Sequence, residues 1–153
     1  MTNPTAAMLV IGDEILSGRT RDSNMHYLAG ELTRIGITLC EVRVVADVQD
    51  DIVAALQALS ARYAHVFTSG GIGPTHDDIT ADAVALAMGA AIGHRADAMA
   101  LLQAHYDRAG LPFNEARQRM ARIPDGAALI DNPVSTAPGF TLGNVHVMAE
   151  VPN

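Results

Sequence analysis

The stretch Ser69-Gly70-Gly71-Ile72-Gly73-Pro74-Thr75-His76-Asp77-Asp78-Ile79-Thr80 joins a short apolar run, residues 65–68, to an apolar helical pattern that begins near Thr80. Its three glycines let the backbone turn with N–H groups pointing outward and no Cβ in the way. A helix that starts just after such a turn directs the positive end of its dipole into the same space. The stretch therefore predicts a strand, a loop able to hold a phosphate group, and a helix that Thr80 caps.

The residues before this loop alternate between strand and helix patterns. Residues 7–11 form an apolar run that ends at Gly12, and residues 37–46 form a second run rich in Val. Ser23 can cap a helix that ends at Gly36, and Asp50 or Asp51 can start another. This alternation predicts right-handed crossovers and a mostly parallel sheet with helices on both faces. The predicted apolar helix faces are Met25, Leu28, Leu32 and Ile35; Ile52, Leu56, Leu59 and Tyr63; and Val84, Ala87, Met88 and Ala91.

The second half of the chain is less regular. Residues 98–108 have a helical pattern that ends near Gly110, and Asn114 can cap a short helix that runs through Ile123. Three short strands are expected after it, at residues 127–130, 139–142 and 145–148, with Pro-containing turns between them. We expect residues 1–153 to form a single domain, truncated at its C-terminus because the sequence stops just after a strand.

Charge and composition exclude several classes of partner. The net charge is −7 and the chain has no Lys, which argues against nucleic acid because counterion release needs a dense cationic surface. No apolar stretch approaches the ~20 residues that span a bilayer, and the lone Cys40 fits a cytoplasmic location. Arg117, Arg119 and Arg122 lie close together; a solvated helix face is the favoured interpretation, and contact with an anionic ligand is the alternative.

Acidic side chains follow all three predicted parallel strands. Asp13 and Glu14 follow the first strand, Asp47 follows the second, and Asp77 and Asp78 lie in the glycine-rich loop. Ligands bind beyond the carboxyl ends of strands in such sheets, so these groups should meet at one edge. Two carboxylates beside a phosphate would repel it unless a cation such as Mg²⁺ bridges them. We therefore predict Asp77 and Asp78 as metal ligands, with stabilisation of the helix N-terminus as the alternative.

The same loops supply the predicted ligand-binding residues. Hydroxyl and amide side chains there can donate to phosphate or ring oxygens, although each alone also fits a turn or a cap. A Walker loop is excluded because it requires Lys. The predicted ligand-binding residues are Gly12, Asp13, Glu14, Ser17, Gly18, Asn24, Ser69, Gly70, Gly71, Gly73, Pro74, Thr75 and Thr80.

Three segments together resemble a known family. They are Ile11-Gly12-Asp13-Glu14-Ile15-Leu16-Ser17-Gly18 with Asn24 following, the stretch 70–80 quoted above, and Asn132-Pro133-Val134-Ser135-Thr136-Ala137-Pro138-Gly139-Phe140. In order and spacing they resemble the molybdopterin-binding (molybdenum cofactor biosynthesis, MoaB/Mog-like) domains. More narrowly, they resemble the N-terminal domains of the competence/damage-inducible (CinA) type.

The resemblance implies a three-layer α/β/α fold with a mostly parallel sheet and a C-terminal antiparallel portion, assembled as a homo-oligomer, a dimer or trimer. It implies a phosphorylated pterin or nucleotide as ligand, with Mg²⁺ or another divalent metal. In relatives that adenylylate molybdopterin, positions similar to Asp47 and Asp78 are tied to activity, so these two are the predicted catalytic residues. The CinA-type domains imply metal-dependent hydrolysis of a dinucleotide pyrophosphate such as ADP-ribose. The alternatives are molybdopterin adenylylation, as in the cofactor-synthesis relatives, and a non-catalytic binding or oligomerising module.

Two positions depart from the family pattern. Ser135 stands where the family usually has Gly. Ala149-Glu150-Val151-Pro152 stands where the family often has Pro-Gly-Val-Pro, so Glu150 adds a negative charge near the predicted phosphate site. This second departure favours ligand binding over turnover.

Overall fold

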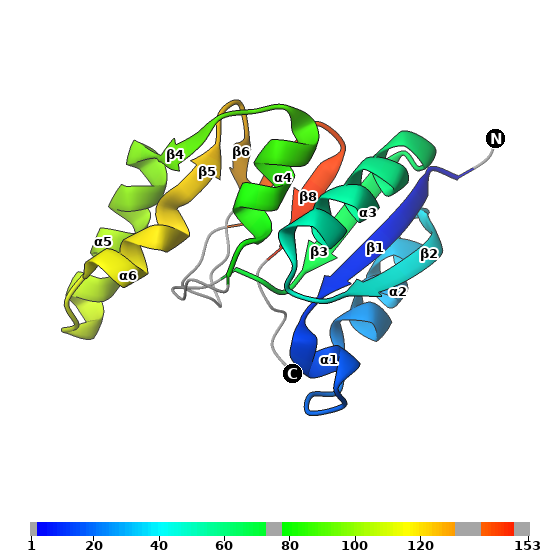
Figure 1. Cartoon of the computed structure of the whole chain (residues 1–153), viewed down its shortest axis with the longest axis horizontal. Helices are drawn as coiled ribbons and strands as arrows, with labels where there is room; N and C mark the ends of the chain where they lie inside the picture. The colour runs from blue at the N-terminus through cyan, green and yellow to red at the C-terminus, as the bar shows by residue number, and fades with distance from the viewer. Residues whose placement is uncertain (1–2, 73–77, 131–138, 149–153) are drawn as a thin grey trace.

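The computed structural model describes residues 3–72, 78–130 and 139–148. Its centre is a six-stranded sheet of order β2-β1-β3-β8-β7-β6 (Figure 1). Strands β2, β1, β3 and β8 are parallel, whereas β7 runs antiparallel to both β8 and β6. The predicted parallel sheet with an antiparallel C-terminal portion is therefore confirmed. The strands are β1 (Thr5–Ile11), β2 (Thr38–Val45), β3 (His65–Ser69), β6 (Ala128–Ile130), β7 (Gly139–Leu142) and β8 (Val145–Val147).

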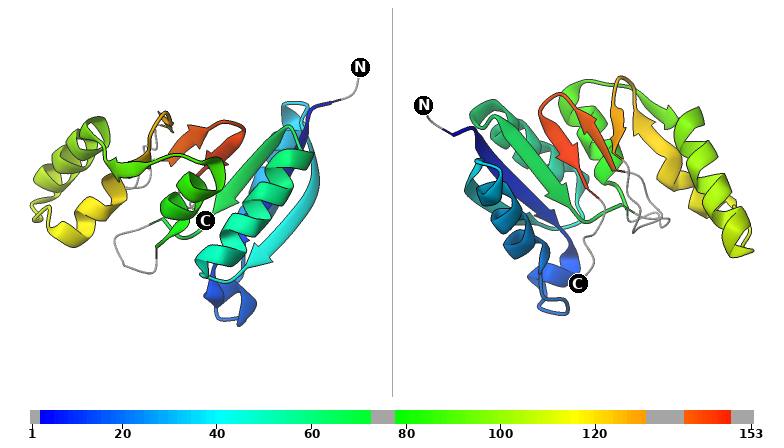
Figure 2. Two further views of the ribbon diagram at one scale, coloured as in Figure 1. Left: turned by 45° about the horizontal axis from the view of Figure 1, so that its top comes forward. Right: turned by 180° about the vertical axis from the view of Figure 1, so that it is seen from behind.

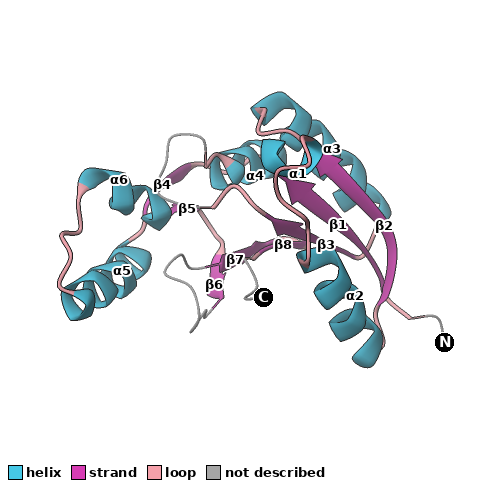
Figure 3. Ribbon diagram, turned by 90° about the horizontal axis from the view of Figure 1, so that it is seen from below, coloured by secondary structure: helices cyan, strands magenta, loops and turns pink. Residues whose placement is uncertain are grey.

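Helices cover the sheet on both sides, as predicted. Helices α3 (Gln49–Arg62) and α4 (Thr80–Met88) lie on one face, and α2 (Asn24–Arg34) lies on the other (Figure 3). Strand β1 is buried between them, because alternate residues of its apolar run point to opposite faces. Leu9 belongs to the core beneath α3 and α4, whereas Met8 belongs to the core beneath α2.

A smaller lobe extends from the antiparallel end of the sheet (Figure 1). It contains α5 (Ala96–Ala109), α6 (Glu115–Gln118), a 3₁₀ turn (Arg119–Ala121) and an antiparallel pair of strands, β4 (Ile92–His94) and β5 (Arg122–Pro124). The sequence patterns did not predict β4, and the predicted helix through Ile123 is wrong because the chain becomes extended at Arg122.

The helix starts differ from the predicted ones in two places. Ser23 makes no side-chain cap; the carboxylate of Asp22 accepts the backbone N–H groups of Asn24 and Met25 instead, at 3.2 and 3.1 Å. Thr80 is the first residue inside α4, and Ile79 stands at the cap position. The predicted cap at Asn114 is confirmed, since its side chain accepts the N–H of Arg117 at 2.9 Å.

Two predicted apolar faces extend too far. Met25 and Ile35 are 43% and 58% exposed, so only Leu28 and Leu32 anchor α2 to the sheet. Helix α4 ends at Met88 because Gly89 adopts the left-handed conformation, which leaves Ala91 outside it. No helix in the described part of the chain combines the length and apolar character needed to cross a membrane.

Candidate functional site

The loops after β1 and β2 are tied together at the carboxyl edge of the sheet. The backbone N–H of Asp13 donates to Oδ2 of Asp47 at 3.1 Å, and the N–H of Asp47 donates to Oδ1 of Asp13 at 3.0 Å. Asp13 also begins a short helix, α1 (Asp13–Leu16), where the sequence predicted a loop. Each carboxylate therefore fixes the other loop, which holds both side chains at one edge as predicted.

Asp47 lies in an acidic environment. Burial is the main cause that raises the pKa of its carboxyl, and the charges of Asp13, Glu14 and Asp78 raise it further. The N–H of Asp13 opposes these effects by stabilising the charged form. Because the charges of all three neighbours act on Asp47, acidic groups from the loops after β1, β2 and β3 lie near one another. Such a cluster favours a bound cation, which would relieve the repulsion.

The glycine turn (residues 70–72) connects β3 to the start of α4. Gly70 and Gly71 have φ angles of +90° and +71°, which disfavour residues with a Cβ. A Cβ on Gly70 would lie 2.0 Å from the carbonyl oxygen of Ile11, and one on Gly71 would lie 2.0 Å from Oγ1 of Thr80. Both glycines are therefore required for the turn to pack between β1 and α4.

Thr80 orients this turn. Its Oγ1 donates to the carbonyl of Gly70 at 2.9 Å, and its N–H donates to the carbonyl of Gly71 at 3.2 Å. In a trans peptide the N–H points away from the C=O, so the N–H groups of Gly71 and Ile72 point away from Thr80. Neither donates to a backbone carbonyl within residues 3–72, 78–130 and 139–148. Successive backbone N–H groups that point the same way are of the kind that binds an anion.

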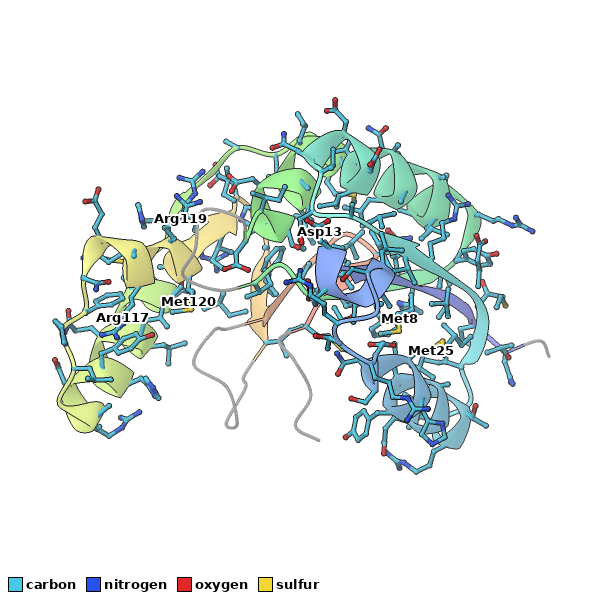
Figure 4. All side chains as sticks on the ribbon, turned by 60° about the horizontal axis from the view of Figure 1, so that its bottom comes forward. Met8, Asp13, Met25, Arg117, Arg119 and Met120 are labelled. Carbon is cyan, nitrogen blue, oxygen red and sulfur yellow. The ribbon has the colours of Figure 1, made fainter. Side chains whose placement is uncertain are left out.

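One hollow adjoins this turn, and a second lies beyond it against the small lobe. The inner hollow, about 20 Å³, is lined by Gly71, Ile72 and Asp78 together with Arg119 and Arg122 from the small lobe. The outer hollow is about 460 Å³, and Arg119 and Arg122 line it as well. Figure 4 shows Asp13 and Arg119 on opposite sides of α4. The site is thus acidic on the side of the main sheet and carries both arginines and carboxylates on the side of the small lobe. The outer hollow is lined by Asp82, His94, Glu115, Ala116, Arg119 and Arg122.

The three arginines predicted as one solvated face have separate roles. Arg117 lies over the ring of Tyr106, 4.8 Å from its centroid, and donates to the carbonyl of Pro112 at 2.7 Å. Arg122 donates to Asp82 of α4 at 2.7 Å, which links the small lobe to the helix that starts at the site. Arg119 and Arg122 line both hollows, so the alternative of contact with an anionic ligand stays open for them.

The sequence of residues 7–152 matches the family described as probable molybdopterin binding domain. This chain belongs to that family. A structure of the protein CinA with unknown function from Thermoplasma acidophilum superposes on it with a TM-score of 0.87 and 33% identity, covering 98% of this chain and 90% of that one. The chain is thus a molybdopterin-binding domain of the CinA type.

More distant relatives share the fold. The tungsten cofactor synthesizing protein MoaB from Pyrococcus furiosus has a TM-score of 0.59 at 16% identity, covering 97% of this chain and 83% of that one.

Among sequences, a protein of Pyrobaculum calidifontis is 40% identical over 137 residues, and one of Metallosphaera sedula is 38% identical over 139. Each match covers 90% of this chain and 52% of the relative, so the chain spans about half the length of these proteins.

The remaining predicted ligand residues of this molybdopterin-binding domain occupy varied positions. Ser69 is buried at the end of β3, whereas Ser17 and Gly18 lie exposed at the end of α1. The hydroxyl of Ser17 donates to the carbonyl of Glu14 at 3.3 Å, and Asn24 begins α2. Their role toward a ligand stays a prediction. Gly73, Pro74, Thr75, Asp77, Ser135 and Glu150 lie outside the described residues.

The donor chemistry of the edge fits a divalent cation that the ligand itself helps to hold. Among the residues that the structure describes, no three His, Cys, Asp or Glu side chains are grouped to bind a metal by themselves. Mg²⁺ needs fewer protein ligands than that, since it is commonly held by one or two carboxylates together with substrate phosphates and water. Asp78, whose charge raises the pKa of Asp47, stays the predicted metal ligand in the described part of the chain.

Proposed function

We propose that this domain binds a phosphorylated pterin or nucleotide at the carboxyl edge of its sheet. The observation that carries the proposal is the glycine turn held by Thr80 beside the reciprocal Asp13–Asp47 pair. The turn offers outward N–H donors for a phosphate, and the carboxylates offer a place for the cation that would accompany it. Membership of the molybdopterin-binding family supports the same class of ligand.

We further propose that the ligand is a dinucleotide pyrophosphate such as ADP-ribose, which the domain hydrolyses. One water molecule would add across the P–O–P bond and release AMP and ribose 5-phosphate. Asp47, held in place by the N–H of Asp13, would accept the proton of that water as a general base. Asp78, with Asp77, would hold a divalent cation that neutralises charge on the phosphate oxygens.

Binding is tested by the effect of ligands on thermal unfolding. The probes are ATP, ADP-ribose, FAD and a molybdopterin analogue, each with and without Mg²⁺. A ligand at 100 times its Kd stabilises the folded state by about 2.7 kcal/mol, so a true ligand should raise the Tm clearly. If none of the four probes changes the Tm, the proposed site is wrong and an oligomerising role is favoured.

Turnover is tested by chromatography of ADP-ribose incubated with the protein and Mg²⁺. We expect AMP to form, and we expect Asp47→Asn and Asp78→Asn to lose this activity. Asp50→Asn, at an exposed position in the first turn of α3, is the matched control and should behave like the unmodified chain. Binding of ADP-ribose without AMP formation would overturn the hydrolysis and leave a binding module.

A further inference from the structure

The small lobe carries a guanidinium whose Nε has no hydrogen-bond partner. Nε of Arg119 is buried, and no described residue accepts from it. Its neighbour Arg122 is different, because Asp82 accepts from that guanidinium at 2.7 Å. A partly buried Arg that has no anionic partner lacks the charge-assisted hydrogen bonds that its guanidinium can form. The planar guanidinium is therefore well suited to bind an anion such as phosphate.

The carboxylates near Arg119 do not neutralise it. Asp82 and Glu115 line the same outer hollow, but Asp82 is paired with Arg122, and Glu115 is exposed on the first turn of α6. His94 adds a further nitrogen donor at the rim. The outer hollow therefore combines the Arg122–Asp82 ion pair with Arg119, which forms no ion pair with a described carboxylate.

Only the outer hollow is large enough for a small molecule. The inner one, about 20 Å³, has room for little more than one water molecule, whereas the outer one, about 460 Å³, falls within the range of small-molecule sites. Its lining is mostly charged and includes no Phe or Tyr among the described residues. Such a surface suits a phosphorylated sugar better than a flat ring that needs stacking.

We propose that Arg119 binds the second phosphate of a diphosphate ligand and that the outer hollow holds the attached sugar. This subsite rests on the proposed function, because it assumes that the first phosphate lies at the glycine turn. Arg119 lines both hollows, so it lies between Gly71 and Asp78 on one side and the outer hollow on the other. The domain then selects diphosphate diesters over monophosphates.

The test compares the Kd of AMP with the Kd of ADP-ribose, used as its non-hydrolysable methylene-bridged analogue, by calorimetry in the presence of Mg²⁺. We expect Arg119→Gln to weaken ADP-ribose binding about tenfold or more, since a hydrogen bond to a charged group has that effect. AMP binding should change less than about twofold, and Arg119→Lys should be intermediate because a point charge lacks the fork. Arg108→Gln, at an exposed position at the end of α5, is the control and should leave both values unchanged.

The outcomes separate the two proposals. In the first outcome the unmodified chain binds both ligands, and Arg119→Gln either reduces both affinities equally or changes neither affinity. The subsite is then wrong and the proposed function stands. If the unmodified chain binds neither ligand, the proposed function fails and the subsite fails with it. Matching circular dichroism melting curves for the variants would show that a lost affinity does not reflect unfolding.

Discussion

Gly71 and Thr80 show how one pair of residues connects the fold to the site. Gly71→Ala should destabilise the domain beyond the about 1–2 kcal/mol that a left-handed backbone costs a residue with a side chain, because its Cβ would meet Oγ1 of Thr80. The measurement is the free energy of unfolding in urea. Gly110→Ala is the control, since Gly110 has the same φ of +71° and nothing within 4 Å of an added Cβ.

A double-mutant cycle identifies the contact responsible. In a Thr80→Ala background the hydroxyl is absent, so Gly71→Ala should cost less than in the unmodified chain. It should still cost somewhat more than Gly110→Ala, because the Cβ of residue 80 lies 3.2 Å from the added Cβ. An equal cost of Gly71→Ala in both backgrounds would show that the contact with Thr80 does not restrict this position.

Thr68 differs from Thr80, because its hydroxyl forms no hydrogen bond in the described part of the chain. It is fully buried, and its Oγ1 has no hydrogen-bond partner in the described part of the chain. A buried hydroxyl without a partner costs about 1–3 kcal/mol, so Thr68→Val should raise the free energy of unfolding by about 1 kcal/mol. A lower stability for this variant in urea would show that the hydroxyl does have a partner in solution.

At the scale of elements, β3, β8 and β7 carry a chain of polar contacts. The contacts lie on the face of the sheet against which α2 packs. The right-hand view of Figure 2 shows that α2 does not extend over the C-terminal strands of this face. His65 Nδ1 lies 3.0 Å from His146 Nε2, and His146 Nδ1 lies 2.9 Å from the hydroxyl of Thr141. Phe67 packs beside them, with its ring centroid 4.9 Å from that of His146. Burial, and then the charge of His65, lower the pKa of His146 below its ordinary value of 6.5.

This lowered pKa predicts a loss of stability in acid. Below about pH 6.5 the unfolded chain protonates His146 more readily than the folded one, so the free energy of unfolding should fall as the pH falls. His146→Gln cannot titrate and should show a weaker decline between about pH 7 and pH 5. The exposed His26→Gln is the control and should retain the full decline. Identical pH profiles for all three proteins would contradict the prediction.

At the scale of the whole molecule, the small lobe and the main sheet share one hydrophobic core. Leu56 of α3 and Leu102 of α5 are both fully buried in the same cluster. We therefore expect either Leu→Ala substitution to lower the free energy of unfolding of the entire domain by about 2–5 kcal/mol. Calorimetry should show a single transition in each case. A separate low-temperature transition in Leu102→Ala alone would mean that the lobe unfolds independently.

The amino-acid sequence by itself determined the order of the main strands and helices and the edge at which their loops meet. The apolar run of β1 and the stripe of α3 are local patterns, and parallel crossovers place Asp13, Asp47 and Asp78 at one edge whatever the details of packing. The three-layer arrangement and the acidic site could therefore be predicted before any coordinates were known.

Only the tertiary structure decided which residues complete that site. Strands β4 and β5 have three residues each and pair across a long intervening helix, so no local period marks them. That pairing brings Arg119 and Arg122 to the glycine turn and separates them from Arg117. Thr80 is likewise a residue type that commonly caps helices, as the sequence predicted. In the structure its hydroxyl instead donates to the carbonyl of Gly70, because the glycine turn packs against it. Side-chain partners of this kind depend on distant chain segments, which sequence periodicity does not specify.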